Sequence, residues 1–266
     1  GREPYGATCW PPFIGTRRHN VRRKQAMRPV CDVSRGNLAC SAMIESITRK
    51  RLEAVLDAAQ GRRVAVVGDA MLDVYLRGEV ERISPEAPVP VVRVSERKMA
   101  LGGAANVANN IVTIGAKGEL VAAAGADSAG ATLRSMLADV GADTRSLVSV
   151  RRPTTTKTRV VARSQQLVRY DEEDDADLDA DETGSLLEAL RVAIGEADAL
   201  VFEDYNKGVL VESVIEKGIG WAKERGIPVV VDPKYRNFFS YRGATIFIPN
   251  RRELESALGA AVGLDR

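Results

Sequence analysis

Short runs of consecutive apolar residues alternate along the chain with segments whose apolar residues fall at helical spacing. Unbroken apolar runs are typical of strands buried in a parallel sheet, and spacing of three to four residues is typical of helices packed on one. The predicted strands cover residues 63–69, 119–124, 146–150, 199–202, 227–232 and 245–248. The predicted helices cover residues 46–60, 104–114, 128–140, 182–194 and 211–225, with a short helix after 250. This order predicts an α/β fold, a mostly parallel sheet with helices on both faces.

Glycines and capping residues mark the ends of several predicted helices. The first helix is expected to begin at Ser46, to carry Leu52, Val55 and Leu56 on one face and to stop at Gly61. The second follows the pair Gly102-Gly103, carries Asn106 in its first turn and ends at Gly115. A glycine turn before a helix lets a ligand approach backbone N–H groups, but it also serves close packing, and both interpretations stay open.

Two segments interrupt the alternation, at about residues 77–98 and 153–171. The first contains Pro85, Pro88 and Pro90, which confine a strand to a sheet edge or to a separate small sheet. The second alternates threonine and β-branched residues with cations, as in an exposed strand. We therefore expect two β excursions outside the main sheet. The acidic residues 171–181 that come next are expected to form a solvated loop.

Polar clusters stand after four of the predicted strands. Parallel strands end at one edge of a sheet, where α/β proteins bind their ligands, so these clusters should gather there. They are Asp69 with Asp73, Asp204 with Lys207, Asp232 with Lys234, and Asn250 with Glu253. Carboxylates accept hydrogen bonds from hydroxyls, whereas lysines and backbone N–H groups hold phosphates. The set suggests phosphoryl transfer to or from a sugar, although Asp69 could equally cap a turn and Asp73 could be solvated.

Residues 1–42 differ in composition from the rest of the chain. They hold eight Lys or Arg against two acidic residues, and all three cysteines and the single histidine. We expect these residues to be disordered. They could be a transit peptide, a basic arm that binds nucleic acid, or sequence upstream of a start at Met43. The abrupt change in composition favours the last of these interpretations. The remainder has a net charge of −4 and neither Cys nor His, which excludes a Cys/His metal site or a Ser–His–Asp triad there.

The motifs resemble those of the ribokinase-like (PfkB) carbohydrate kinases, in the same order along the chain. They are Gly68-Asp69 with Asp73, Gly102-Gly103-Ala104-Ala105-Asn106, Asp204-Tyr205-Asn206-Lys207-Gly208, Asp232-Pro233-Lys234 and Asn250-x-x-Glu253. Within that family, residues 83–91 (ISPEAPVPV), 156–159 (TKTR) and 165–169 (QQLVR) resemble the kinase domains of bifunctional heptose-phosphate kinase/adenylyltransferases. Residues 43–266 would be the N-terminal part of such a domain, with residues 77–98 and 153–171 as a small β lid.

The resemblance implies roles for individual residues. Those expected to hold the sugar phosphate are Asp69, Asp73, Gly102, Gly103, Asn106, Lys157, Arg159, Gln166 and Arg169. Those expected along the phosphate path are Asp204, Lys207, Asp232 and Lys234. Asn250, Arg251, Arg252 and Glu253 would lie by ATP and Mg²⁺, with Glu253 acting on the metal indirectly. Glu203 departs from the family, which usually has a small residue there.

The implied reaction transfers phosphate from ATP to the anomeric hydroxyl of D-glycero-D-manno-heptose 7-phosphate. Family members carry a Gly-Ala-Gly-Asp segment after the Asn-x-x-Glu motif, and its Asp is the general base. The sequence lacks this segment. We therefore expect no catalytic base in this chain, an inactive fragment and part of the fold missing. Another sugar kinase of the family and a non-catalytic sugar-phosphate binder remain alternatives. The other expectations are a cytoplasmic location, a homodimer formed through the lid, and no nucleic-acid or membrane partner.

Overall fold

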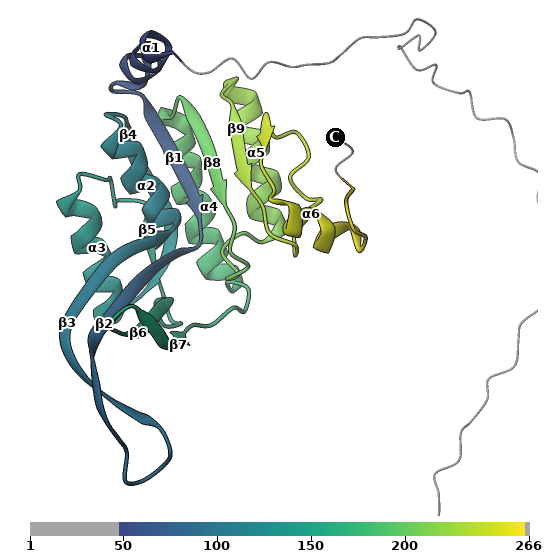
Figure 1. Cartoon of the computed structure of the whole chain (residues 1–266). Helices are drawn as coiled ribbons and strands as arrows, with labels where there is room; N and C mark the ends of the chain where they lie inside the picture. The colour runs from purple at the N-terminus through teal and green to yellow at the C-terminus, as the bar shows by residue number, and fades with distance from the viewer. Residues whose placement is uncertain (1–47, 264–266) are drawn as a thin grey trace, which may run out of the picture. The chain divides into compact units, whose positions relative to one another are not determined.

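The computed structural model describes residues 48–263, and they form two sheets (Figure 1). The first is six-stranded, and every neighbouring pair in it is parallel. Its order is β10 (Ile246–Phe247), β9 (Val229–Asp232), β8 (Ala199–Glu203), β1 (Arg63–Gly68), β4 (Lys117–Gly125) and β5 (Leu147–Val150). The predicted α/β fold with a mostly parallel sheet is confirmed. The expectations for residues 1–42, and the cap Ser46, lie outside the described residues.

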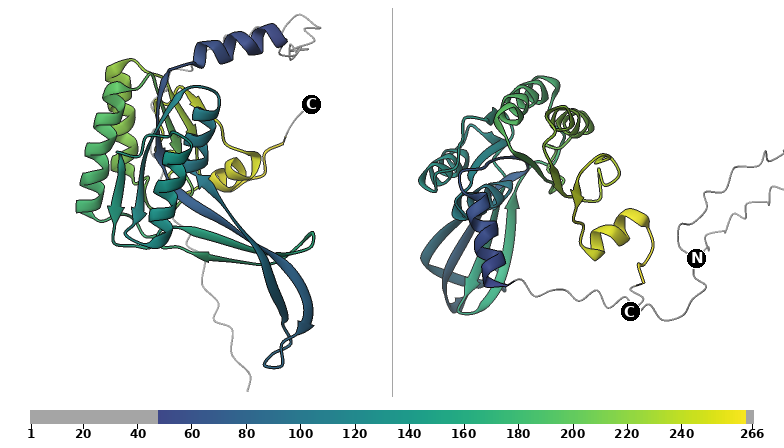
Figure 2. Two further views of the ribbon diagram at one scale, coloured as in Figure 1. Left: turned by 90° about the vertical axis from the view of Figure 1, so that its left-hand side faces the viewer. Right: turned by 90° about the horizontal axis from the view of Figure 1, so that it is seen from above.

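Helices cover both faces of this sheet (Figure 2). On one face, α2 (Ala104–Thr113) and α3 (Ser128–Asp139) pack on a core that includes Val66 and Leu120. On the other, α4 (Ala180–Glu196) and α5 (Glu212–Arg225) pack on a core that includes Val67 and Phe202. Val66 and Val67 are neighbours in β1 and belong to different cores because side chains alternate along a strand. Both faces are therefore apolar, and polar groups collect at the strand ends.

The first helix, α1 (Arg49–Ala59), begins later than predicted. Its N-cap is Thr48, whose hydroxyl accepts a hydrogen bond from Arg51 N at 3.2 Å. Its apolar face is present, but Leu52 and Val55 are about half exposed, and the helix has no buried residue. Spacing alone predicted an apolar stripe, and the described part of the chain does not cover it.

The second sheet has four strands in the order β3 (Pro90–Gly103), β2 (Ala70–Ile83), β6 (Thr156–Ala162) and β7 (Gln165–Glu172). The β2–β3 hairpin extends away from the first sheet (Figure 1). β3 begins at Pro90 and is an edge strand, as the prolines of this segment predicted. β2 begins at Ala70, directly after β1, so Asp73 lies within a strand of the second sheet instead of a loop after β1.

Strand register separates the two faces of the second sheet. Asp73 pairs with Lys157 and Tyr75 with Arg159 across β2 and β6, so these polar side chains share one face. Residues Val74 and Leu76 alternate with them and carry the other, apolar face. The sheet thus presents charge on one side and apolar surface on the other.

The expectation that residues 171–181 form a solvated loop is confirmed only in part, because residues 173–179 lie outside helices and strands and most of them are exposed, but Leu178 is buried and the two ends of the segment belong to β7 and α4. Residues 173–179, called the strap here, connect β7 to α4 and contact the β8–α5 loop. Leu178 N donates to Gly208 O at 3.0 Å, and Arg152 Nη1 donates to Ala176 O at 2.6 Å. Acidic composition favours solvation locally, but these long-range contacts fix the strap.

The last described helix is α6 (Arg251–Leu258), which comes after β10 at the sheet's edge. Among residues 48–263, no helix combines the length and the apolar character that crossing a bilayer requires.

Candidate functional site

The carboxyl ends of β1, β8, β9 and β10 lie side by side in the first sheet, because these strands are consecutive neighbours. Each is followed by one of the predicted polar clusters. In addition, Asp204 N donates to Asp232 O at 3.1 Å, and Lys234 Nζ reaches Glu253 Oε1 at 2.5 Å. Asp69 and the three clusters after β8, β9 and β10 therefore form one polar edge, as the order of elements along the chain predicts, whereas Asp73 lies on the second sheet.

Asp69, at the end of β1, is buried with 1% of its surface exposed. Its carboxylate accepts hydrogen bonds from the backbone N–H groups of Tyr205 at 2.8 Å, Lys207 at 3.0 Å and Val209 at 3.3 Å. Burial raises its pKa, and the bonds from Lys207 and Tyr205 act against that rise. In this conformation Asp69 orders the β8–α5 loop, and the direct contact with a sugar expected of it stays a prediction.

The glycine pair before α2 also has a packing role. A Cβ on Gly103, whose φ is +55°, would lie 2.3 Å from Asp69 O, and one on Gly102 would lie 2.8 Å from an Asp73 carboxylate oxygen. The first N–H of α2, that of Ala104, donates to Asp69 O at 3.0 Å. Asn106 is exposed in the first turn. The structure therefore supports close packing for the two glycines, while their contact with a ligand stays a prediction and Asn106 is accessible to one.

On the second sheet, Asp73 forms an ion pair with Arg159 at 2.5 Å, and both side chains are about four-fifths buried. The Arg159 guanidinium also lies 5.3 Å from the centre of the Tyr75 ring. Burial opposes ionisation of Arg159, but the hydrogen bond to Asp73 outweighs it and raises the arginine pKa. The structure thus joins two of the predicted sugar-phosphate residues, Asp73 and Arg159.

Lys157 and Lys207 come from different sheets and meet at one carboxylate. Glu173, in the strap, accepts from Lys157 Nζ at 3.0 Å and from Lys207 Nζ at 2.6 Å. Asp171 accepts from Lys157 Nζ at 3.2 Å and pairs with Arg169 at 3.1 Å. Sequence reasoning missed Glu173 and Asp171, because they stand in an acidic run and their lysine partners are distant in sequence. Gln166 lies exposed near the other end of β7, away from this cluster.

Further along the edge, acidic residues surround Lys234, which lies 3.7 Å from Asp232 and 5.1 Å from the centre of the Tyr205 ring. Asp204 is buried, and it accepts from the Tyr241 hydroxyl at 2.8 Å and from Asn206 N at 2.8 Å. Glu203 is also buried; burial and the nearby charge of Asp232 raise its pKa to about 7. This departure from the family pattern thus places a carboxyl group that can gain or lose a proton near neutral pH beside the predicted phosphate path.

Asn250 and Glu253 form a capping box at the start of α6. Asn250 Oδ1 accepts from Glu253 N at 3.0 Å, and Glu253 Oε2 accepts from Asn250 N at 2.8 Å. Arg251 pairs with Glu255, and Arg252 is exposed. Glu253 is thus committed to the cap and to Lys234, and within the described ranges no group of three or more carboxylates suits a metal ion. The indirect role on Mg²⁺ predicted for Glu253 stays a prediction.

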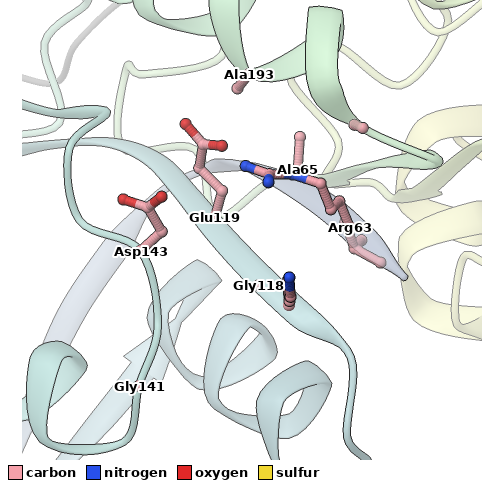
Figure 3. A pocket seen from close by; sticks show the side chains of 10 residues that line it. Arg63, Ala65, Gly118, Glu119, Gly141, Asp143 and Ala193 are labelled. Carbon is pink, nitrogen blue, oxygen red and sulfur yellow. The ribbon is translucent and has the colours of Figure 1, made fainter. Parts of the chain in front are cut away.

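A cavity of about 310 Å³ lies at the opposite end of the first sheet, beside the starts of β1 and β4 (Figure 3). Arg63, Glu119 and Asp143 line it. The Glu119 carboxylate is held by Arg145 at 2.9 Å and by the Ser146 hydroxyl at 2.7 Å. None of the predicted site residues lines this cavity, and its buried carboxylate has its partners within the protein.

Comparison with known proteins agrees with the motifs. A family model described as pfkB family carbohydrate kinase matches residues 62–263. The bifunctional protein HldE of Gluconacetobacter diazotrophicus is 47% identical over 203 residues, which are 76% of this chain and 42% of that protein. HldE of Rhodospirillum rubrum is 47% identical over 204 residues, covering 76% of this chain and 41% of that protein. The chain thus spans less than half the length of these curated relatives.

Solved structures share the fold. The tetrameric inhibited form of phosphofructokinase-2 from Escherichia coli superposes with a TM-score of 0.59 at 22% identity, over 76% of this chain and 66% of that one. Arabidopsis thaliana ribokinase complexed with ribose and ATP superposes with a TM-score of 0.54 at 19% identity, over 75% of this chain and 64% of that one. With a family model that covers most of the chain and a fold shared with sugar kinases, the protein belongs to the pfkB family of carbohydrate kinases.

Proposed function

We propose that this chain serves the transfer of phosphate from ATP to the anomeric hydroxyl of D-glycero-D-manno-heptose 7-phosphate, forming the 1,7-bisphosphate. The observation that supports this choice is the 47% identity to HldE proteins, against about 20% for the solved sugar kinases of other kinds. The lid motifs that suggested a heptose-phosphate acceptor lie within the matched region.

The charged face of the second sheet suits the phosphate end of such an acceptor. Lys157, Arg159 and Arg169 stand on it, and Asp73 and Asn106 would meet sugar hydroxyls. Lys207, Asp232 and Lys234 would line the path of the transferred phosphoryl group, with Asn250 near ATP. ATP supplies the phosphoryl group. Phosphoryl transfer depends mainly on positioning and on neutralising charge, which this set of residues provides.

Calorimetry with heptose 7-phosphate, unphosphorylated heptose and fructose 6-phosphate tests the acceptor. We expect heptose 7-phosphate to bind at least about tenfold more tightly than unphosphorylated heptose, because a charge-assisted contact to phosphate contributes about 1.5 to 3 kcal/mol. Lys157→Met should remove most of that difference.

Arg163→Met is the matched control, since it removes one positive charge from the exposed β6–β7 turn on the same hairpin. It should leave acceptor affinity unchanged. Equal affinity for both heptoses, or equal loss in the two variants, would contradict the proposed acceptor while leaving the family assignment intact.

For the oligomer, we propose that two copies pair through the apolar face of the second sheet. Val168 and Tyr170 on β7 are about half exposed, and they share this face with Val160 and Leu76. Exposed apolar patches rimmed by charge are typical of protein interfaces. Sedimentation equilibrium should give twice the monomer mass, and Val168→Glu should give the monomer mass; a monomeric parent protein would refute this pairing.

A further inference from the structure

One carboxylate holds together two lysines that belong to different sheets. Lys157 lies on β6 of the second sheet, and Lys207 lies in the loop after β8 of the first. Glu173 Oε2 accepts from Lys157 and Glu173 Oε1 from Lys207, at 3.0 and 2.6 Å. The three side chains are between 14% and 24% exposed, so solvent reaches them but does not surround them. Two ammonium groups this close repel each other unless an anion lies between them.

Each lysine also has a contact other than Glu173, through its ammonium group in Lys157 and through its backbone in Lys207. Asp171, two residues before Glu173, also accepts from Lys157 Nζ at 3.2 Å. The backbone N–H of Lys207 donates to the buried Asp69 carboxylate at 3.0 Å. The hydrogen bonds that the Glu173 carboxylate accepts from described residues, by contrast, both come from these lysines. The Lys157 ammonium group and the Lys207 backbone therefore have anchors of their own, whereas the anion between the two ammonium groups is one side chain at the first residue beyond β7.

We propose that Lys157 and Lys207 form a single phosphate subsite and that Glu173 is an internal counter-anion that occupies it until the phosphate group of a ligand takes its place. A phosphate carries more negative charge than a carboxylate and offers oxygens to both ammonium groups at once, which favours the exchange. Only the identity of the ligand rests on the proposed function; the subsite itself rests on the geometry.

The exchange also links the two sheets. While Glu173 holds both lysines, the strap joins β6 to the β8–α5 loop. When a ligand phosphate holds them, the ligand makes that connection and the Glu173 side chain, at the start of the strap, is released. The anchor at Leu178, whose N–H donates to Gly208 O, lies five residues further on and is not affected directly.

Titration of the full chain with inorganic phosphate tests the proposal without any turnover. Glu173→Gln keeps the size of the side chain and removes its charge, so phosphate no longer competes with an internal anion. We expect this variant to bind inorganic phosphate about tenfold more tightly than the parent protein, which corresponds to about 1.4 kcal/mol. Glu173→Gln combined with Lys207→Met should lose the gain.

Glu172→Gln is the matched control, because it removes the same charge from the adjacent, exposed position, whose side chain points to the other face of the strand. It should change phosphate affinity less than twofold. If Glu173→Gln does not fold, Glu173→Asp replaces it, since the shorter carboxylate cannot reach both lysines and should also tighten phosphate binding. Unchanged or weaker phosphate binding in Glu173→Gln, or an equal gain in Glu172→Gln, would overturn the proposal. A negative result in the experiment with heptose 7-phosphate would not by itself overturn this proposal, because that experiment tests only the identity of the ligand.

Discussion

Replacing Asp69 with alanine is expected to lower the free energy of unfolding by about 3 to 5 kcal/mol, the cost of removing one side of a buried charged network. The change leaves the N–H groups of Tyr205, Lys207 and Val209 without the carboxylate that accepts from them. Urea denaturation followed by circular dichroism measures the loss. Asp69→Asn should lower the free energy of unfolding by less than Asp69→Ala does, since the asparagine amide keeps one acceptor oxygen.

Asp57→Ala is the control for this prediction. Asp57 is exposed on α1, and its side chain makes no hydrogen bond within residues 48–263. Its loss should change the free energy of unfolding by less than about 0.5 kcal/mol. If Asp69→Ala cost no more than Asp57→Ala, the β8–α5 loop would be held by contacts other than the buried carboxylate.

The polar edge of the first sheet could be predicted from the sequence, because it depends on strand order and on the residues that come directly after each strand. Apolar runs at β1, β8 and β9 each end in acidic residues, and parallel strands end at the same edge. The function of Asp69 could not be predicted this way. Its partners lie 136 to 140 residues further along the chain, and no local pattern shows that their N–H groups converge on it.

The contacts of the strap and the start of β2 could not be predicted from local sequence patterns either. Glu173 stands in an acidic run, which favours solvent on composition alone, yet Lys207 holds it from 34 residues away. β2 begins a single residue after β1, and its first part carries Asp73 among apolar residues, so no turn signal separates the two sheets in the sequence. Local propensity determines elements, whereas the pairing of distant charges is a property of the folded chain.

Replacing Gly208 with alanine is expected to lower the free energy of unfolding by about 3 kcal/mol, the sum of a left-handed backbone cost and a steric one. Gly208 has φ of +75°, and a Cβ there would lie 2.0 Å from Ala176 O in the strap. That contact is with backbone, so the strap itself must move. The movement breaks the bond from Leu178 N to Gly208 O and pulls Glu173 away from Lys207.

Gly226→Ala separates the two contributions. Gly226, the residue that ends α5, has φ of +66°, and a Cβ there would meet nothing within 4 Å. Its replacement should therefore cost only the backbone contribution, about 1 kcal/mol. Urea denaturation of both variants measures the difference, which is the steric cost of moving the strap away from Gly208. Equal losses in the two variants would mean that the strap yields at no cost, and the acidic residues would then behave as the solvated loop that their composition predicts.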